Sequence, residues 1–109
     1  MKAIVIGPDR GLGEALEAAG VSVERIEGIG SGQAMEEVGI DDADLLVVTN
    51  VEEATSVPIA LERNPDLRTV VYSPDSVPEF VRGQLDFALD PDLLGPVTVA
   101  EELTGTAEQ

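Results

Sequence analysis

Two residue types that carry much of protein chemistry are missing from this 109-residue chain, which has no cysteine and no histidine. Without cysteine there is no disulfide framework and no thiolate nucleophile. Without histidine there is neither the commonest general base nor the commonest ligand of transition metals. The length predicts a single domain, residues 1–104, followed by a frayed acidic tail at residues 105–109 that has nothing to pack against.

Positive charge is also scarce. Twenty-two acids face six basic residues, of which Lys2 is the only lysine, and the formal net charge is −16. The acids are spread along the chain, and diffuse charge indicates solvation rather than a binding site. With few aromatic residues and many small apolar ones, this composition resembles that of proteins from salt-in halophiles; an acidic protein with a basic partner is the alternative. Nucleic-acid binding is not expected, because the chain has no basic stripe.

Long apolar runs are absent as well. No stretch reaches the ~18 residues that a membrane span needs, and the first residues lack a signal-peptide pattern. We therefore expect a cytoplasmic protein with no direct membrane insertion.

Segments with strand and helix patterns alternate along the chain. Strand patterns cover residues 2–6, 21–26, 45–48, 68–72 and 87–89, and helix patterns cover residues 12–19, 31–38, 53–63, 77–82 and 96–103. Ser31 and either Asp75 or Ser76 are expected helix caps, and Pro96 suits a first helical position. The alternation predicts a Rossmann-like α/β fold, a doubly wound parallel sheet of about five strands in three layers. The default strand order is 3-2-1-4-5, with ligands at the carboxyl ends of the strands.

The stretch VIGPDRGLGEAL, residues 5–16, joins the first strand to the first helix. Its glycines follow the spacing G-x-x-x-G-x-G through Gly7, Gly11 and Gly13. Gly7 is expected to permit the tight turn, Gly11 a close backbone approach, and Gly13 packing of the helix on the sheet. Glu27 lies 27 − 7 = 20 positions after Gly7, where a dinucleotide-binding fold has its ribose-binding acid.

Two residues of the same loop oppose phosphate binding. Pro8 has no N–H to donate, and Asp9 places an anion, and a good helix cap, where a phosphate would lie. Arg10 offsets that charge in part, as the only basic side chain near the loop. Two possibilities remain open: a nucleotide-binding loop, or a Rossmann turn that only joins strand to helix.

Residues 41–94 resemble the N-terminal domain of potassium-transport regulators, the Trk-system and potassium-conductance-regulating (RCK or KTN) proteins. The resemblance runs through Asp44, Thr49, Glu53, Asn64-Pro65, Val70–Tyr72 and Asp90-Pro91, and with the first β-α-β unit it covers nearly the whole chain. It implies a stand-alone haloarchaeal member of this family.

Such domains bind NAD(H) or adenine nucleotides and set the gating of a membrane potassium transporter. The resemblance therefore implies NAD(H), ATP or ADP as ligand and a potassium transporter as a possible partner. By position, Gly7, Arg10, Gly11 and Gly13 match the phosphate loop, Glu27 matches the ribose-binding acid, and Thr49 and Asn50 match the strand end that lines the cofactor.

Enzyme chemistry is not expected. A short-chain dehydrogenase needs a tyrosine with a lysine four residues on, but the only tyrosine is Tyr72 and position 76 is Ser. A phospho-receiver domain, which has a similar five-stranded topology, needs acids after strand 1, an aspartate ending strand 3 and a lysine ending strand 5. The chain has Gly7-Pro8, Thr49-Asn50 and Asp90 there.

The acids Asp41, Asp42 and Asp44 precede a buried strand, so turn and solvent roles are favoured over a cation site. Two functional hypotheses remain. One is a non-catalytic, nucleotide-sensing regulatory module. The other is a Rossmann-like interaction or scaffold domain with a degenerate, non-binding pocket. A homodimer is expected in either case, because the short fifth strand and the last helix lie at a sheet edge.

We predict that the chain unfolds in dilute buffer and folds in molar KCl, because self-repulsion of sixteen excess negative charges is screened when the Debye length shrinks to about 3 Å. Circular dichroism across a KCl titration measures this. A chain that stays folded in dilute buffer contradicts the halophile interpretation.

Overall fold

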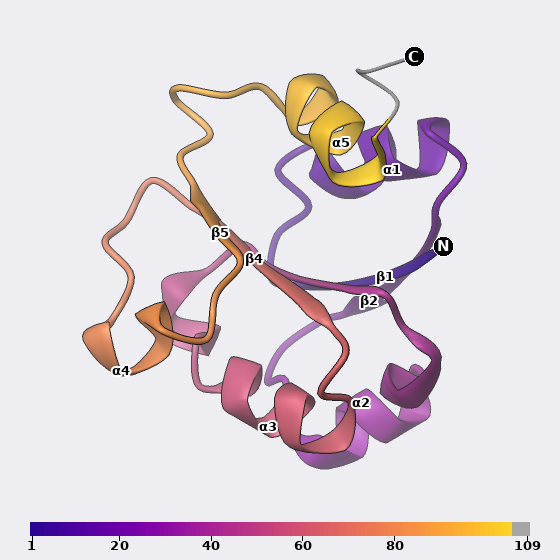
Figure 1. The fold of residues 1–109 in the computed structure, drawn as a ribbon, viewed down its shortest axis with the longest axis vertical. Helices are drawn as coiled ribbons and strands as arrows, with labels where there is room; N and C mark the ends of the chain where they lie inside the picture. Colours follow the sequence, from indigo (N-terminus) through magenta and orange to yellow (C-terminus); the bar gives the residue numbers. More distant parts are fainter. Residues whose placement is uncertain (106–109) are drawn as a thin grey trace.

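A computed structural model of the chain describes residues 1–105 and contains five successive strand-helix units (Figure 1). The strands are β1 (Lys2–Ile6), β2 (Ser22–Ile26), β3 (Leu45–Val48), β4 (Arg68–Tyr72) and β5 (Phe87–Leu89). The helices are α1 (Leu12–Ala18), α2 (Gly32–Glu37), α3 (Ser56–Arg63), α4 (Glu79–Arg82) and α5 (Pro96–Thr104), with 3-10 turns η1 (Ile40–Asp42) and η2 (Val51–Glu53). Of the expected tail, only Gly105, which ends α5, lies within the described residues.

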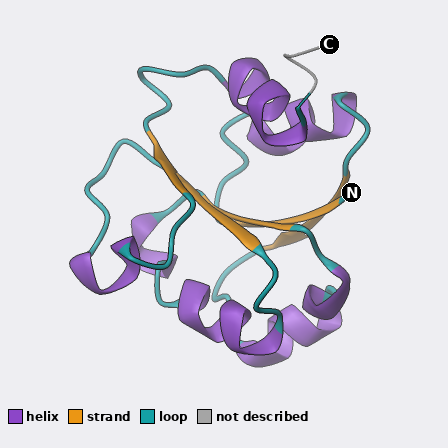
Figure 2. Cartoon of the chain, viewed as in Figure 1, coloured by secondary structure: helices purple, strands orange, loops and turns teal. Residues whose placement is uncertain are grey.

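The five strands are all parallel and form one sheet (Figure 2). Helices α1 and α5 cover one face, and α2, α3 and α4 cover the other (Figure 1). The predicted class, a doubly wound α/β fold of three layers, is confirmed.

The strand order is β2-β1-β3-β4-β5, not the default 3-2-1-4-5 that we predicted. All four residues of β3 are fully buried, so this strand needs a neighbour on each side as well as a helix layer on each face. β2 carries exposed Ser22, Glu24 and Arg25 and belongs at an edge, where solvent reaches these side chains. The switch point consequently falls between β1 and β3, which brings the loop after β3 beside the loop after β1.

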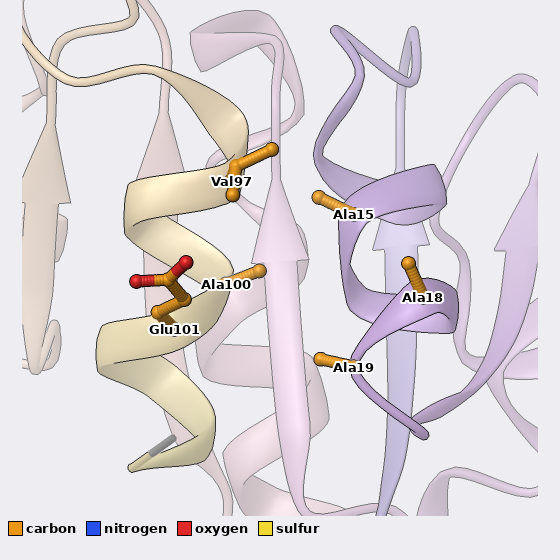
Figure 3. Close-up of a pocket in the computed structure, with 6 residues that line it drawn as sticks. All are labelled: Ala15, Ala18, Ala19, Val97, Ala100 and Glu101. Carbon is orange, nitrogen blue, oxygen red and sulfur yellow. The ribbon is translucent and has the colours of Figure 1, made fainter. Parts of the chain in front are cut away.

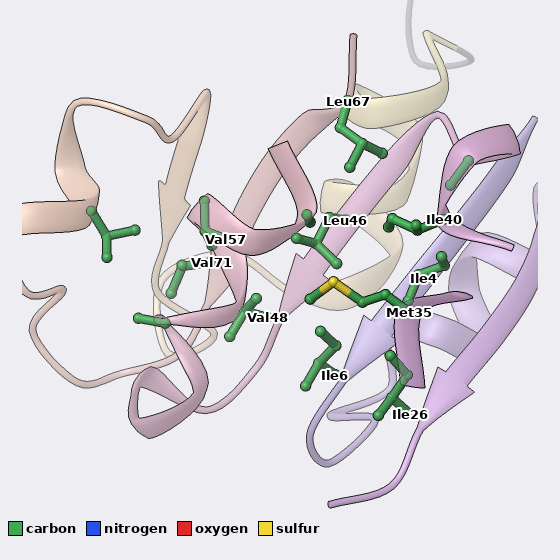
Figure 4. Close-up of a cluster of buried hydrophobic side chains, with 14 residues drawn as sticks. Ile4, Ile6, Ile26, Met35, Ile40, Leu46, Val48, Val57, Leu67 and Val71 are labelled. Atoms are coloured by element: carbon green, nitrogen blue, oxygen red, sulfur yellow. The ribbon is translucent and has the colours of Figure 1, made fainter. Parts of the chain in front are cut away.

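The sheet separates two apolar cores. Ile4 and Ile6 of β1 point into the core beneath α2 and α3, together with Met35 (Figure 4). Ala3 and Val5, of opposite parity, point into the core beneath α1 and α5. Full burial of one such leucine or isoleucine contributes roughly 1.5–3 kcal/mol, so both faces of the central strands stabilise the fold.

Helices α1 and α5 lie side by side because small residues face each other between them. Figure 3 shows the alanines of α1 opposite α5, with a shallow groove above them. The groove is lined by Ala15, Ala18, Ala19, Val97, Ala100 and Glu101. Val97 therefore faces α1 and not β5.

Several helix ends follow the predicted signals and two do not. Ser31 caps α2, its hydroxyl accepting from the Ala34 N–H at 3.1 Å, and Pro96 occupies the first turn of α5. α3 begins three residues later than expected, because the Asn50 side chain instead caps the 3-10 turn η2. α4 begins after Pro78, whose extended ψ of 142° keeps it out of the helix, so neither Asp75 nor Ser76 caps it.

Tyr72 ends β4 and is fully buried. Its hydroxyl donates to the carbonyl oxygen of Leu94 at 2.7 Å, which ties the carboxyl end of β4 to the segment before α5. Burial raises the pKa of the Tyr72 hydroxyl above its ordinary value; the Arg10 charge opposes this rise, and the Asp90 charge adds to it.

We expect Tyr72→Phe to lower the free energy of unfolding by about 1 kcal/mol near neutral pH, the worth of one buried hydrogen bond. The raised pKa stabilises the folded state fully below about pH 10, where tyrosine in the unfolded chain ionises, and this contribution is lost as the pH rises through the folded-state pKa. Urea unfolding in molar KCl from about pH 8 to about pH 11 should therefore show a steeper loss for the wild type than for Tyr72→Phe. If the free energy of unfolding falls equally with pH in both proteins, the raised pKa of Tyr72 is contradicted.

Candidate functional site

The switch point opens into a cleft of about 560 Å³ between the carboxyl ends of β1, β2 and β3. Its lining residues are Gly7, Pro8, Asp9, Arg25, Glu27, Gly28, Ile29, Asn50 and Glu53. Of the residues expected at a nucleotide site, the structure brings Gly7, Glu27 and Asn50 to this cleft. Arg10, Gly11, Gly13 and Thr49 do not line it.

Gly7 and Thr49 form the joint between β1 and β3. Gly7 has φ +107°, and a Cβ there would lie 2.5 Å from the Thr49 hydroxyl oxygen. Thr49 is fully buried, and its hydroxyl donates to the Ile6 carbonyl oxygen at 3.2 Å. The glycine thus makes the tight turn as predicted, whereas the threonine side chain is engaged by the turn and unavailable to a ligand.

Arg10 is fixed by a hydrogen bond to the backbone at the end of β3. It is the one residue other than glycine with positive φ among residues 1–105, at 50°, and its Nε donates to the Thr49 carbonyl oxygen at 2.8 Å. Gly11, with φ +81°, precedes α1, and a Cβ on it would lie 3.1 Å from Cγ of Pro96. Both residues therefore fix the loop against its neighbours instead of facing the cleft.

Gly13 makes room for an ion pair. A Cβ at this position would lie 2.1 Å from Oδ1 of Asp9 and 2.8 Å from Nη2 of Arg25. We expected Gly13 to let α1 pack on the sheet; the structure instead shows a side-chain pair filling the space that the glycine leaves. The third glycine of the motif thus accommodates the loop's own anion.

The carboxylate of Asp9 lies at the start of α1. Arg25 donates to Asp9 Oδ1 through Nε at 3.0 Å, and the Glu14 N–H approaches Asp9 Oδ2 at 3.3 Å. Arg25 Nη2 also donates to Glu17 at 2.9 Å. The hydrogen bonds that Arg25 donates to Glu17, and to a lesser extent to Asp9, raise the pKa of Arg25, so the guanidinium stays charged. The predicted helix cap at Asp9 is therefore wrong: Gly11 is the N-cap residue, and the Asp9 carboxylate reaches the first turn of α1 from two residues further back.

Sequence reasoning missed two charged residues of the cleft, Arg25 and Glu53. Arg25 shares the parity of Val23, which packs toward α1, and this alternation is the signal that would have placed it over the start of that helix. The Glu53 carboxylate accepts from the Gly30 N–H at 2.9 Å. This contact joins residues far apart in the sequence, so no local pattern predicts it.

The remaining acid of the predicted site, Glu27, is exposed at the end of β2. Within residues 1–105 it makes no hydrogen bond or ion pair. Asn50 is half-buried, and its side-chain oxygen accepts from the Glu52 N–H at 3.0 Å. Of these two side chains, only the Glu27 carboxylate is thus free to bind a ligand in the cleft, because the Asn50 oxygen already accepts a hydrogen bond within a turn.

The acids before β3 have turn and solvent roles, as predicted. Asp41 and Asp42 are exposed in η1, and Asp44 accepts from the Lys2 backbone N–H at 2.8 Å. No group of three side chains suited to a metal ion occurs in the described part of the chain. The same residues include no helix long and apolar enough to cross a bilayer.

The chain belongs to the family of unknown function DUF7126, whose model matches residues 3–103. None of the curated proteins matches it. Solved structures with the same fold include the orphan response regulator HP1043 of H. pylori (14% identity, 96% of this chain and 94% of that one, TM-score 0.74). A second is the CheY-like receiver domain protein of Methanospirillum hungatei JF-1 (13% identity, 98% of this chain and 93% of that one, TM-score 0.69). A third is an atypical orphan response regulator (17% identity, 94% of this chain and 93% of that one, TM-score 0.68).

At these identities the likeness shows the fold alone, a receiver-like arrangement of five strands and five helices. The family match and these structures carry no link to potassium transport or to NAD, so the resemblance to potassium-transport regulators finds no support here. What the comparisons do support is a small α/β domain that shares its fold with these receiver-like structures.

We predict that Gly7→Ala destabilises the fold by more than about 3 kcal/mol, since it adds overlap with a buried hydroxyl to left-handed backbone strain. Gly20→Ala is the matched control: Gly20 has φ +91° but no atom within 4 Å of its Cβ position, so only the strain of about 1–2 kcal/mol remains. Denaturant unfolding in molar KCl compares them, and equal losses would show that the contact with Thr49 does not restrict residue 7.

Proposed function

We propose that this protein is a non-catalytic, receiver-like regulatory module that acts through contacts with other proteins, with a switch-point cleft that takes neither a phosphoryl group nor a nucleotide. The observation that carries this proposal is the Asp9 carboxylate, which lies at the start of α1 and is held there by Arg25.

A phosphate entering the cleft at α1 would meet unfavourable charge. It would approach Asp9 directly, with Glu27 and Glu53 on the same lining, while the nearest cation, Arg25, already pairs with two carboxylates. Pro8 contributes no N–H, and Arg10 is bonded to the Thr49 carbonyl. The usual anion site of this loop is therefore filled by a side chain of the protein itself.

Phosphoryl transfer to the chain is disfavoured by the residues at the strand ends. The position after β3 holds buried Thr49 and Asn50, neither of which is a carboxylate that accepts a phosphoryl group, and β5 is followed by Asp90 where a receiver has lysine. The atypical orphan response regulator with this fold is described as having a phosphorylation-independent mechanism. We infer the same mode for this chain.

A nucleotide sensor is the second candidate. It is favoured by the open cleft of about 560 Å³ and by Glu27, whose unengaged carboxylate is placed to accept from a ribose hydroxyl. In that case NAD(H) or an adenine nucleotide would lie across the ends of β1 and β3, and Asp9 would have to leave the start of α1. Coupling to a potassium transporter has no supporting observation beyond the resemblance in sequence.

The test is a thermal-shift panel in molar KCl with NAD, NADH, ATP, ADP, AMP, cyclic dinucleotides, and acetyl phosphate with Mg²⁺. We expect no shift, whereas a ligand at a hundred times its Kd would stabilise the fold by about 2.7 kcal/mol. Any shift that the wild type shows and Glu27→Ala loses would overturn the proposal in favour of the nucleotide sensor. In that event Asp9→Gly should enlarge the shift, because it removes the competing anion.

A further inference from the structure

The two edges of the sheet are protected differently. Edge strand β2 exposes Glu24 and Arg25, charged residues of the kind that prevent pairing with another chain. Edge strand β5 has no charged residue, and both Phe87 and Ala88 are exposed. In a chain with twenty-two acids, an uncharged edge is a local exception.

A hollow of about 300 Å³ lies beside this edge, between β5 and α5. It is lined by Phe87, Leu89, Leu94, Thr98, Val99, Glu102 and Leu103. Three of the seven large apolar side chains that are exposed in residues 1–105 lie on β5 or in the segment that follows it: Phe87, Leu93 and Leu94. Apolar side chains gathered around a hollow mark a contact surface.

Leu93 projects beside this hollow from a fixed turn. It is 81% exposed, the highest value among those seven side chains. The N–H groups of Leu93 and Leu94 both donate to the Asp90 carbonyl, at 3.0 and 2.9 Å, and Tyr72 holds the Leu94 carbonyl. Because the turn is already ordered, docking Leu93 into a partner costs little conformational entropy.

The charges at the two ends of β5 differ. At its start, Arg68 lies over the Phe87 ring at 5.6 Å and donates to the Leu103 carbonyl, and it pairs with no carboxylate in the described part of the chain. Asp86 at the same end accepts from the Thr69 N–H. At the other end the 90–95 segment carries Asp90 and exposed Asp92.

We propose that a second copy of this chain docks on the β5 edge in a two-fold, antiparallel arrangement. Leu93 of each copy enters the hollow of the other, and Arg68 of each meets Asp90 and Asp92 of the other. The same surface carries the projecting Leu93, the hollow that receives it, and charges of both signs. It is therefore self-complementary, as a two-fold interface requires. β5 is only three residues long, so side chains carry the contact. The inference rests on the proposed function, in which the module works by protein contact.

A second copy fits this surface better than the other occupants. A strongly basic partner would be drawn to the rest of the acidic surface, but at this edge it would meet Arg68. A small apolar molecule would fill the hollow without using Leu93 or the charges at the two ends of β5. Two copies that each carry −16 repel over long range, so the dimer requires the salt that screens them.

The first experiment is size-exclusion chromatography with light scattering in molar KCl, at concentrations up to the high micromolar range. We expect a wild-type dimer and expect Leu93→Asp to weaken it by about thirtyfold or more, as loss of a central contact does. Val97→Asp is the matched control: Val97 is 62% exposed but faces α1, so its dimer should persist. Circular dichroism checks that each variant is folded.

The second experiment tests the charges at the lowest salt that keeps the chain folded. Asp92→Lys and Arg68→Glu should each weaken the dimer, and mixing the two variants should restore a heterodimer, because each contact then pairs opposite charges. If Arg68→Glu does not fold, Asp92→Lys is compared with Asp41→Lys, which changes the net charge equally on exposed η1. Asp92→Lys should then weaken the dimer while Asp41→Lys does not.

A wild-type monomer at high micromolar concentration overturns the inference, as does dissociation by Val97→Asp but not by Leu93→Asp, or equal behaviour of Asp92→Lys and Asp41→Lys. A co-purified apolar molecule released on denaturation from a monomeric chain overturns it in favour of a ligand pocket. None of these results bears on nucleotide binding at the switch point, and a nucleotide-dependent thermal shift would leave the dimer result unchanged. The two proposals can therefore fail separately.

Discussion

The burial of β3 on every side is the constraint from which the rest of the structure follows. Four consecutive apolar residues, Leu45–Val48, require a helix layer on each face and a strand on each edge, and the place of β3 between β1 and β4 provides both. That placement puts Thr49 against the turn at Gly7, where the threonine hydroxyl and the missing Cβ of the glycine fit together. It also puts the Thr49 carbonyl within reach of Arg10. The Thr49 hydroxyl and the Arg10 side chain, which were expected to face a nucleotide, thus hold the ends of β1 and β3 together.

The few basic side chains form structural contacts, and most of them donate hydrogen bonds to backbone carbonyl oxygens. Arg25 and Arg63 pair with carboxylates, whereas the other four of the six donate side-chain hydrogen bonds to backbone oxygens. These bonds are Lys2 to Gly39, Arg10 to Thr49, Arg68 to Leu103 and Arg82 to Val77. The Leu103 carbonyl lies in the last turn of α5, where a cation is favoured by the helix dipole. Most of the acids are therefore left without a cation partner in residues 1–105, which is the condition that the predicted need for salt assumes.

The fold class could be predicted because it depends on local pattern. Alternating strand and helix segments, together with the cap at Ser31 and the proline at the start of α5, fix the layers without any knowledge of long-range contacts. The strand order could not be predicted by default, although the exposed charges of β2 and the wholly apolar β3 contain that information. An edge strand is recognised by its polar face, and the commonest topology takes no account of that signal.

The candidate site was predicted in position but not in chemistry. The loops at residues 7–13, 27–28 and 49–50 do meet at the carboxyl ends of the strands, as the fold requires. The role of Gly13 in α1 was missed because it depends on Arg25, twelve residues further on in β2 (25 − 13 = 12). A glycine motif reports only that a side chain is absent; what fills the space depends on residues elsewhere in the chain. Here it is a carboxylate, which is why we propose that the cleft takes no phosphate although the spacing suggests a phosphate loop.

The switch point and the β5 edge are joined through Tyr72. The Arg10 charge is near enough to the Tyr72 hydroxyl to act on its pKa, and that hydroxyl holds the Leu94 carbonyl in the turn that presents Leu93. Contiguity alone is not regulation, since coupling requires an element with two arrangements that both sites bias. The bond from Arg10 to the Thr49 carbonyl lies on this path, and Asn50, the next residue after Thr49, lines the cleft. A partner that draws Arg10 away would therefore also change the field around Tyr72.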